Sequence, residues 1–310
     1  MKRWIKITLL VLSSLILITV GYGIYLYQSV KSTANAIYEP REPVKPVTTD
    51  KSPQGGLPVS MNEREPYTVL VMGVDQREND VGRSDTMIVL SINPSKESIL
   101  MFNIPRDTRT EIIGHGTTDK INHAYAFGGV NMALQTVENF LQVPMNYYIK
   151  VNMEGFSQII DLLGGVEVNN QFSFQYDSHD FKEGILKLNG SEALAYSRMR
   201  YDDPRGDFGR NARQREVLTQ TLKNALQVSN IVRVQSMLDE VGNNVKTDIS
   251  FDEMKKFITD YRSDLNRIDT LELVGQGKMI NGIYYYQVDR AEKDRVHNEI
   301  EEHLKKADNE

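Results

Sequence analysis

Cysteine is absent from the 310 residues of the sequence, and basic residues are in the minority. Without cysteine, disulfide bonds, thiolate metal sites and a cysteine nucleophile are all excluded. Lysine and arginine together number 36, against 42 aspartate and glutamate residues, so the formal net charge is −6. Sequence-independent binding to nucleic acid needs a basic face, and we therefore expect no nucleic-acid partner. A net charge of −6 is still compatible with a local cationic pocket for a phosphate ligand.

Charge is also absent from residues 7–27, which follow three basic residues near the N-terminus. As an α-helix rising about 1.5 Å per residue, this run spans roughly 31 Å, close to the ~30 Å hydrocarbon core of a bilayer. Basic residues before the run predict that residues 1–6 are cytoplasmic and that the chain after the run is extracellular. A cleaved signal peptide ending near Ala36 is the alternative, but its apolar region is usually shorter. The run favours a single-pass anchor in the cell membrane.

Proline is scarce in the sequence except between residues 28 and 66. Six of the ten prolines lie there, and they are Pro40, Pro43, Pro46, Pro53, Pro58 and Pro66. Proline at this density favours extended, semi-rigid chain and prevents a packed element. We therefore predict a spacer over 28–66, followed by a single extracytoplasmic domain over 67–310.

Segments with strand-like and helix-like patterns alternate through this domain. Strands are expected at residues 67–74, 86–92, 98–104, 147–151, 268–274 and 283–288. Helices are expected at 130–141, 153–163, 191–197, 211–226, from 250 and at 290–305. This order predicts an α/β or α+β fold with a mixed central sheet flanked by helices. The alternation in Tyr284–Tyr286 indicates packing more than a platform for sugars.

Residues 196–215 contain six arginines and no lysine. Lysine would serve a solvated surface as well, but only arginine offers a planar fork that binds two phosphate oxygens at once. The candidates for phosphate binding end one predicted helix or begin the next, and they are Arg198, Arg200, Arg210, Arg213 and Gln214. A surface network of ion pairs with Asp202, Asp203 and Asp207 is the alternative interpretation.

Two aspartates border the loop between the first two expected strands. Asp75 ends the segment Gly73-Val-Asp75, and Asp85 ends the segment Gly82-Arg-Ser-Asp85. Carboxylates at neighbouring strand ends can share a hard cation, and magnesium usually takes one or two of them together with substrate phosphates and water. Turn formation is the ordinary role of aspartates beside a loop, and it remains the alternative here.

A third segment, Asn103-Ile-Pro-Arg-Asp107, follows the third expected strand. Pro105 favours an extended exit from the strand, so we expect Arg106 at the same sheet edge as the two aspartates. Ligands of such sheets collect at strand ends. A simple ion pair between Arg106 and Asp107 is the alternative.

Taken together, these segments resemble the LytR-CpsA-Psr family of cell-wall glycopolymer transferases. The similarity covers roughly residues 67–225, and the N-terminal anchor also fits. Several linked motifs in the same order carry it: Gly73-Val-Asp75, Gly82-Arg-Ser-Asp-Thr86, Ile104-Pro-Arg-Asp107, Lys120-Ile-Asn-His123, Gly164-Gly-Val166, Leu188-Asn-Gly190, Ala193-Leu-Ala-Tyr-Ser-Arg198 and Arg210-Asn-Ala-Arg-Gln-Arg215.

The resemblance implies a polyprenyl-diphosphate carrier as ligand, with its lipid tail in an apolar tunnel. It also implies that Asp75 and Asp85 hold Mg²⁺, or a similar cation such as Mn²⁺, at the diphosphate. The residues implied to bind the diphosphate oxygens are Arg106, Arg198, Arg200, Arg210, Arg213 and Gln214, with Arg83 a weaker candidate. The implied catalytic residues are Asp75, Asp85, Arg106 and Arg198. Residues after about 230 match no motif, and we expect them to complete the core.

The implied reaction is transfer of an anionic glycopolymer, above all wall teichoic acid, from its lipid carrier to peptidoglycan. The result would be a phosphodiester between polymer and wall, with release of polyprenyl phosphate. A hydrolase that cleaves the lipid diphosphate with water would use the same site. A non-catalytic membrane regulator is the other alternative, although nothing in the sequence resembles a DNA-reading helix.

Overall fold

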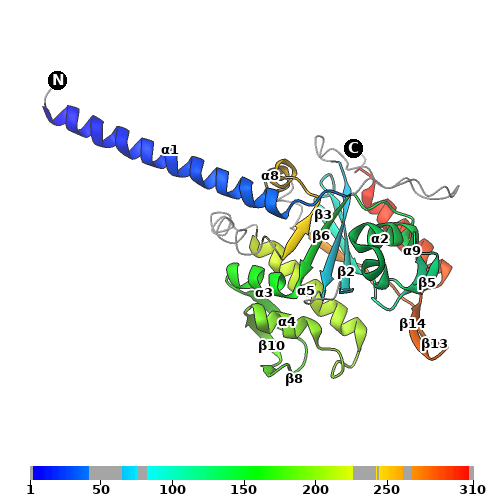
Figure 1. Ribbon diagram of the computed structural model, residues 1–310. Helices are drawn as coiled ribbons and strands as arrows, with labels where there is room; N and C mark the ends of the chain where they lie inside the picture. The colour runs from blue at the N-terminus through cyan, green and yellow to red at the C-terminus, as the bar shows by residue number, and fades with distance from the viewer. Residues whose placement is uncertain are drawn as a thin grey trace.

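The computed structural model describes residues 3–41, 65–75, 82–225, 242, 244–260 and 267–306, and one long helix projects from a mixed α/β domain (Figure 1). The helices are α1 (Arg3–Ile37), α2 (His123–Leu141), α3 (Met153–Leu162), α4 (Gly190–Arg198), α5 (Asp207–Ala225), α8 (Phe251–Asp260) and α9 (Arg290–Leu304). The central strands are β1 (Tyr67–Val74), β2 (Ser84–Asn93), β3 (Ser98–Asn103), β6 (Tyr147–Asn152), β11 (Val245–Thr247) and β12 (Arg267–Thr270). The outlying strands are β4 (Arg109–Ile112), β5 (Thr117–Lys120), β7 (Val166–Asn170), β8 (Phe174–Tyr176), β9 (His179–Phe181), β10 (Gly184–Leu188), β13 (Gln276–Ile280) and β14 (Ile283–Gln287).

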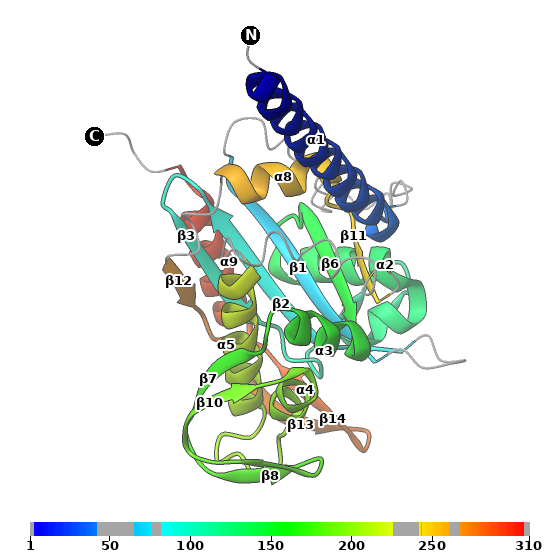
Figure 2. The same cartoon turned by 90° about the vertical axis from the view of Figure 1, so that its left-hand side faces the viewer.

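A six-stranded sheet with the order β11-β6-β1-β2-β3-β12 forms the centre of the domain (Figure 2). β1 runs parallel to β6 and antiparallel to β2, and β2 runs antiparallel to β3. The two edges differ as well, because β11 is antiparallel to β6 whereas β12 is parallel to β3. The predicted mixed sheet flanked by helices is confirmed.

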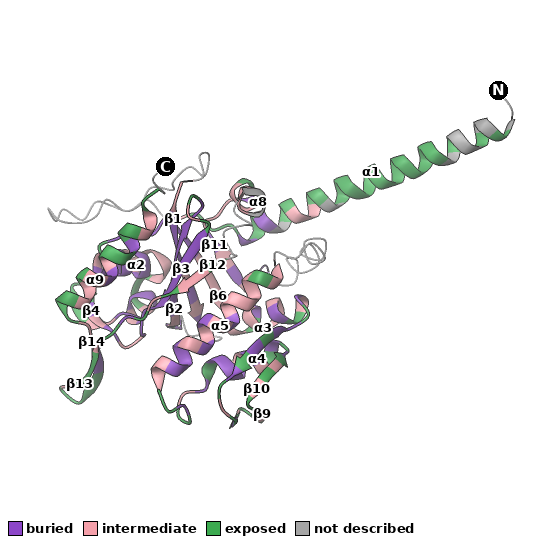
Figure 3. Ribbon diagram, turned by 180° about the vertical axis from the view of Figure 1, so that it is seen from behind, coloured by how far each residue is buried: buried purple, intermediate pink, exposed green. Residues whose placement is uncertain are grey.

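Each face of the sheet buries its own apolar cluster, because successive residues of a strand point to opposite faces. Leu70 of β1 packs in a cluster with Val137 of α2, and residues of α9 belong to the same cluster. Val69, the preceding residue, belongs to the cluster on the other face, against which Leu218 of α5 packs. A third cluster joins α3, α4 and the strands β7 to β10 (Figure 3). Three clusters around one sheet hold α4 and α5 in fixed positions relative to the strand ends.

Two elements differ from the expectation in their length. α2 begins at His123, earlier than expected. A kink with non-helical backbone at residues 128–129 divides it, and the expected helix corresponds to the part after the kink. The apolar period is therefore regular only after the kink. β12 ends at Thr270, although the apolar pattern continues to residue 274. A capping box begins α8, the helix expected from residue 250: the Ser250 amide donates to Glu253 Oε2 at 2.7 Å, and the Glu253 amide donates to Ser250 Oγ at 3.3 Å.

The chain after the apolar run differs from the expected spacer. α1 continues to Ile37, since the first proline comes only at position 40, and the next residues dock on the sheet edge. Tyr38 bridges to Thr247 of β11, and the Arg41 guanidinium pairs with Asp248 at 2.5 Å. A spacer can therefore begin only after residue 41, and residues 42–64 lie outside the described part of the chain.

α1 is the one described helix that is long and apolar enough to cross a membrane, over Leu12–Ile37. Its C-terminal part contacts α8 and β11. The hairpin β13–β14 lies at the opposite end of the domain in both ribbon views (Figures 1 and 2). The strand ends that carry the predicted site therefore face away from α1.

α9 is fixed to the sheet by a half-buried histidine. His303 Nδ1 lies 2.8 Å from Ser91 Oγ of β2, and Nε2 lies 3.1 Å from Ser98 Oγ of β3. Burial, followed by the nearby Lys96 charge, lowers the pKa of His303 to about 4. The folded chain therefore holds this imidazole neutral.

The ordinary pKa of histidine is about 6.5, and that of His303 is about 4. We therefore expect His303 to lower the free energy of unfolding as the pH is reduced from about 6.5 to about 4. In that window the unfolded chain binds the proton and the folded chain does not, so acid favours unfolding. His303→Gln should remove this contribution. The measurement is the urea midpoint of both proteins from pH 7 to pH 4. A difference between them that stays constant with pH would contradict the assignment.

Candidate functional site

The two predicted metal-binding aspartates lie at adjacent strand ends. β1 and β2 pair Gly73 with Thr86, then shift register so that Val74 faces Ser84. The Asp75 amide donates to the carbonyl oxygen of Arg83 at 3.2 Å, which brings the two ends together. A Cβ at Gly73 would lie 3.1 Å from the Thr86 Cβ, so the absence of a side chain permits this close pairing. Asp75 and Asp85 thus border one edge of the sheet.

Arg106 reaches the same edge from the end of β3. Its Nη1 lies 3.2 Å from Asp85 Oδ1, whereas its Nε lies 3.9 Å from Asp107 Oδ2. The ion pair between Arg106 and Asp85 is thus shorter than the pair between Arg106 and Asp107, which was the alternative interpretation. Asn122 donates through Nδ2 to Asp85 Oδ1 at 3.3 Å. About 30% of the Arg106 side chain and 29% of the Asp85 side chain stay exposed, so a ligand can reach both.

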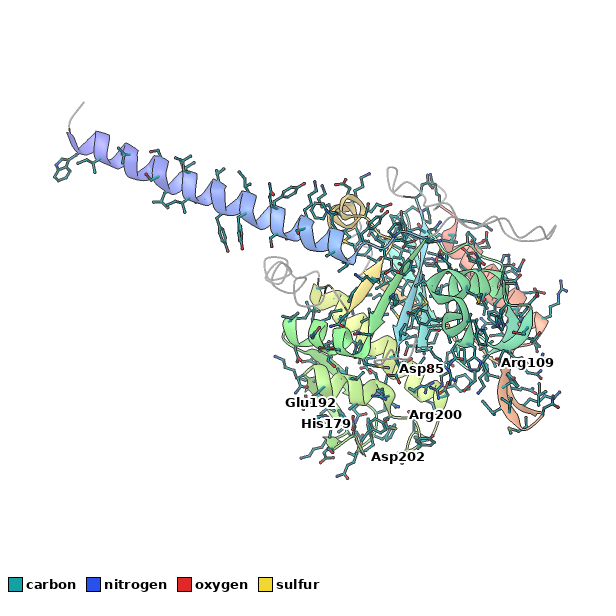
Figure 4. All side chains as sticks on the ribbon, in the orientation of Figure 1. Asp85, Arg109, His179, Glu192, Arg200 and Asp202 are labelled. Carbon is teal, nitrogen blue, oxygen red and sulfur yellow. The ribbon has the colours of Figure 1, made fainter. Side chains whose placement is uncertain are left out.

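Arg200 and Arg210 converge on one carboxylate from the other side. Asp207 Oδ1 lies 2.6 Å from Arg210 Nη2 and 3.6 Å from Arg200 Nε. Burial lowers the pKa of Arg210; the Asp207 charge opposes this shift, and the Arg106 and Arg200 charges add to it. With Asp85 of β2, which also opposes the shift, four charged side chains therefore act on this one buried guanidinium. Figure 4 shows Asp85 and Arg200 at this end of the sheet.

Arg210 keeps an unsatisfied donor in this cluster. Its Nε is buried and has no hydrogen-bond partner among the described residues. A buried N–H without a partner costs free energy, and an acceptor from a ligand would remove that cost. The cluster of Arg106, Arg200 and Arg210, hereafter the arginine cluster, is thus suited to an anion.

Gln214 has a positioning role in the structure. Asn103, at the end of β3, donates to Gln214 Oε1 at 3.0 Å, and Gln214 Nε2 donates to the Ser197 carbonyl at 3.4 Å. The same Asn103 accepts from Arg215 Nη1 at 3.0 Å through its own Oδ1. These bonds join the end of β3 to α4 and α5. Sequence reasoning assigned no role to Asn103 or Arg215, although both lie inside the quoted motifs.

Arg213 is buried and has partners within the chain at all three guanidinium nitrogens. Nε donates to the Tyr196 carbonyl at 3.0 Å, Nη2 donates to the Met199 carbonyl, and Nη1 pairs with the Asp203 carboxylate. Gly209 permits this arrangement, because a Cβ there would lie 1.8 Å from Asp203 Oδ2. Arg213 therefore holds the loop between α4 and α5, and its predicted contact with a ligand stays a prediction.

Arg198 and Arg83 are both exposed. Arg198 ends α4, and within the described part of the chain its guanidinium has no hydrogen bond or ion pair. Arg83 lies where β1 and β2 change register, and only its carbonyl oxygen takes part in the bonds described above. The structure thus leaves Arg198 free for a ligand and gives Arg83 no place in the arginine cluster.

The donors at the sheet edge fit a magnesium ion. Asn122 Oδ1 is buried without a hydrogen-bond partner among the described residues, and its amide nitrogen touches Asp85. Among these residues no group of three or more histidine, cysteine, aspartate or glutamate side chains could hold a metal. Two carboxylates without a complete cage suit Mg²⁺, which completes its shell with phosphate oxygens and water. Asp75 and Asp85 are compatible with that role.

A family model described as the LytR_cpsA_psr family matches residues 24–302. The chain belongs to the LytR-CpsA-Psr family. It is 46% identical over 306 residues to the polyisoprenyl-teichoic acid–peptidoglycan teichoic acid transferase TagU of Halalkalibacterium halodurans, covering 98% of this chain and 99% of that protein.

Solved structures from the family share the fold. The crystal structure of Bacillus subtilis TagU superposes with a TM-score of 0.65 at 46% identity, covering 78% of this chain and 98% of that one. A structure of TagT bound to LIIa-WTA has a TM-score of 0.67 at 28% identity, covering 78% and 91%. This family member thus has the domain that its motifs predicted.

We expect Arg213→Lys to lower the free energy of unfolding by about 3 kcal/mol, because it breaks a buried ion pair and a planar set of bonds. The matched change Arg198→Lys, at an exposed arginine of the neighbouring helix, should stay within about 0.5 kcal/mol of the parent. Urea unfolding followed by circular dichroism measures both. Equal midpoints for the two variants would contradict the positioning role of Arg213.

Proposed function

We propose that this family member transfers an anionic glycopolymer, wall teichoic acid above all, from a polyprenyl-diphosphate carrier to peptidoglycan. The observation that carries the proposal is the arginine cluster with its unsatisfied Arg210 donor beside Asp85. A diphosphate supplies the acceptor oxygens that this cluster lacks. The name of the TagU relative, at 46% identity over nearly the whole chain, supports the same substrates.

The chain's own groups would orient and neutralise the diphosphate. Arg106 approaches from the end of β3, Arg200 and Arg210 approach from the α4–α5 side, and the free Arg198 completes the set. Charge that develops on phosphate oxygens in the transition state is stabilised by such fixed donors. Asn103 and Gln214 keep the two sides at a constant separation. The site thus needs little rearrangement when the donor binds.

The proposed step balances as a phosphoryl transfer. A hydroxyl oxygen of a peptidoglycan sugar bonds to the phosphorus next to the first sugar of the polymer. The bond between this phosphorus and the bridging diphosphate oxygen breaks, and polyprenyl phosphate leaves with the electron pair. The hydroxyl proton passes to a carboxylate at the sheet edge, Asp75 or Asp85. The product is a phosphodiester between polymer and wall.

Asp75 and Asp85 would hold Mg²⁺ against the diphosphate. When bound, the ion supplies charge neutralisation and orients the two phosphates. Arg106 stays within 3.2 Å of Asp85 and would share the same ligand oxygens.

Location and chemistry agree in this proposal. α1 would anchor the chain in the cell membrane, with residues 1–6 cytoplasmic and the domain extracellular. A diphosphate-activated donor needs no ATP, and its lipid lies in the same membrane as α1. Attachment to that membrane raises the effective concentration of such a donor.

Arg198→Lys should lower the transfer rate roughly 100-fold, because an ammonium group cannot bind two phosphate oxygens in one plane. Arg290→Lys, at an arginine of α9 whose side chain is 93% exposed, is the matched control and should retain full activity. The assay combines the full chain in detergent with a lipid-diphosphate-linked polymer and peptidoglycan oligomers, and identifies products by mass. A free phosphorylated polymer without wall adduct would identify a hydrolase instead.

We expect Mg²⁺ to bind weakly to the free protein and much more tightly when a short-chain prenyl diphosphate is present. Two protein carboxylates are too few for a dedicated magnesium cage, so the phosphates must complete it. Isothermal titration calorimetry measures both affinities, and Asp85→Asn should abolish the increase. Tight binding of Mg²⁺ without the diphosphate would contradict the shared site.

A further inference from the structure

The surroundings of α1 change at about residue 27. Its described large apolar side chains between Ile7 and Tyr27 are exposed. Beyond them Val30 is half-buried, and Ala34 and Ile37 are buried where α1 contacts the domain. These three residues share one helix face, because they are three or four positions apart. The side chains available to lipid thus end where the domain begins to cover the helix, so for a membrane anchor the outer bilayer surface lies near residue 27.

α8 meets α1 at this level (Figures 1 and 2). The rings of Tyr27 and Phe251 pack edge to face, with their centroids 5.7 Å apart. Lys255, one turn further along α8, places its Nζ 4.8 Å from the Phe251 centroid and 5.9 Å from the Tyr27 centroid. A cation close to aromatic rings is stabilised by them. The first turns of α8 therefore lie beside the outer end of the apolar run.

The two sides of α8 have different surroundings. Phe257 packs against the apolar cluster on the α5 face of the sheet, so this side completes the core, as expected for the residues after 230. Glu253, one turn earlier, accepts a hydrogen bond from the Tyr147 hydroxyl at 2.7 Å. Asp252 and Lys255 lie away from the core, with side chains that are 81% and 45% exposed. α8 thus presents charged side chains to solvent beside the end of the span.

Three lysines gather around Asp252. Lys31 follows Tyr27 by four residues, so it lies on the face of α1 that meets α8. The bond from Lys255 Nζ at 2.7 Å, and then the charges of Lys255, Lys31 and Lys256, lower the pKa of Asp252. Lys31, Lys255 and Lys256, hereafter the lysine cluster, therefore surround a single carboxylate, and positive charge is in excess at this point.

Positive charge at this level of the molecule fits phospholipid headgroups. Lysines beside an anionic bilayer surface are attracted to it over about one Debye length. Lysine also keeps its methylene chain on apolar surface while its ammonium group reaches the headgroups. Tyr22, Tyr25 and Tyr27 lie at the same end of the run, and aromatic rings are typical of the membrane interface. The arginine cluster, proposed for the diphosphate, lies at the other end of the sheet (Figures 1 and 4).

We propose that the lysine cluster binds anionic phospholipid headgroups of the outer leaflet. The inference rests on the membrane anchor proposed above, but it does not depend on the transfer reaction. Headgroups bound here hold α8 at the bilayer surface, and the core side of α8 transmits this position to the sheet. A segment without any recognised motif thus orients the domain relative to the membrane.

The absence of cysteine from the chain permits a local test. Gln28→Cys, at an exposed position next to Tyr27, gives a single attachment site for a bimane fluorophore. The full chain is reconstituted in mixed vesicles of phosphatidylcholine and phosphatidylglycerol, with either one or the other lipid brominated in its acyl chains. The ratio of the two quenching efficiencies, corrected for composition, measures the local enrichment of phosphatidylglycerol. The basic residues 2, 3 and 6 lie roughly 30 Å away along the helix and do not affect the label.

We expect phosphatidylglycerol to be enriched around the label in the otherwise unchanged chain. The triple variant Lys31→Gln, Lys255→Gln and Lys256→Gln should lower the enrichment roughly fivefold, since the attraction of even one lysine to an anionic surface has this magnitude. Replacement of the same three lysines by arginine should retain it, because the charge is kept. Lys278→Gln, at an exposed lysine of the hairpin β13–β14 at the opposite end of the domain, is the matched control.

Equal enrichment in the triple glutamine variant and in the Lys278→Gln control would overturn the proposal. Loss of enrichment in the arginine variant would overturn it as well, because packing and not charge would then be responsible. Quenching by neither lipid would contradict the anchor itself. If phosphatidylglycerol is not enriched, but a short-chain prenyl diphosphate reduces quenching by brominated phosphatidylcholine, the cluster binds the donor lipid and the assignment to phospholipid is wrong.

Discussion

The burial of guanidinium charge along one helix is the constraint on which the site depends. Arg210, Arg213 and Arg215 of α5 are all at least nine-tenths buried, and a buried charge is tolerated only when it is paired. Arg213 is fully satisfied by Asp203 and carbonyl oxygens, and Arg215 pairs through its two Nη atoms with Asn103 and Glu272. Arg210 alone keeps a buried nitrogen without a partner in the described chain. The pairing of buried guanidinium groups is thus incomplete at Arg210, where an anionic ligand would gain the most binding free energy.

The satisfied arginines determine the geometry around the unsatisfied one. Arg213 fixes the loop after α4, and Asn103 fixes the end of β3 against α5. Arg198 ends α4 and has no ion pair among the described residues, whereas Arg200, just beyond the helix, pairs with Asp207 at 3.6 Å. Preorganised donors of this kind do not have to be reoriented during a reaction, which is the main source of electrostatic catalysis. Arg213, whose guanidinium is fully paired within the chain, therefore contributes to the geometry of the arginine cluster through the loop that it holds.

Much of the fold could be predicted because its signals are local. The strands of the sheet centre are apolar runs between turn residues, and period and capping located most helices. The short hairpins carry too few residues for a period to be visible. The docking of Arg41 on Asp248 could not be predicted, since it joins residues about 200 positions apart. The spacer predicted from proline density stays a prediction for residues 42–64, which lie outside the described part of the chain. Only the position of the first proline could have indicated that α1 continues beyond residue 27.

The site was predictable to the extent that strand ends determine it. Asp75, Asp85 and Arg106 had to meet once β1, β2 and β3 paired in order, because the ends of paired strands lie together. Arg210 and Arg213, three residues apart, share one helix face, so the sequence alone does not separate them. The loop before α5 distinguishes them. Its Asp203 pairs with Arg213, whereas Arg210 lies near Arg106 and Arg200. Distinguishing the fully paired Arg213 from Arg210, which keeps an unsatisfied donor, therefore required the tertiary position of a single carboxylate.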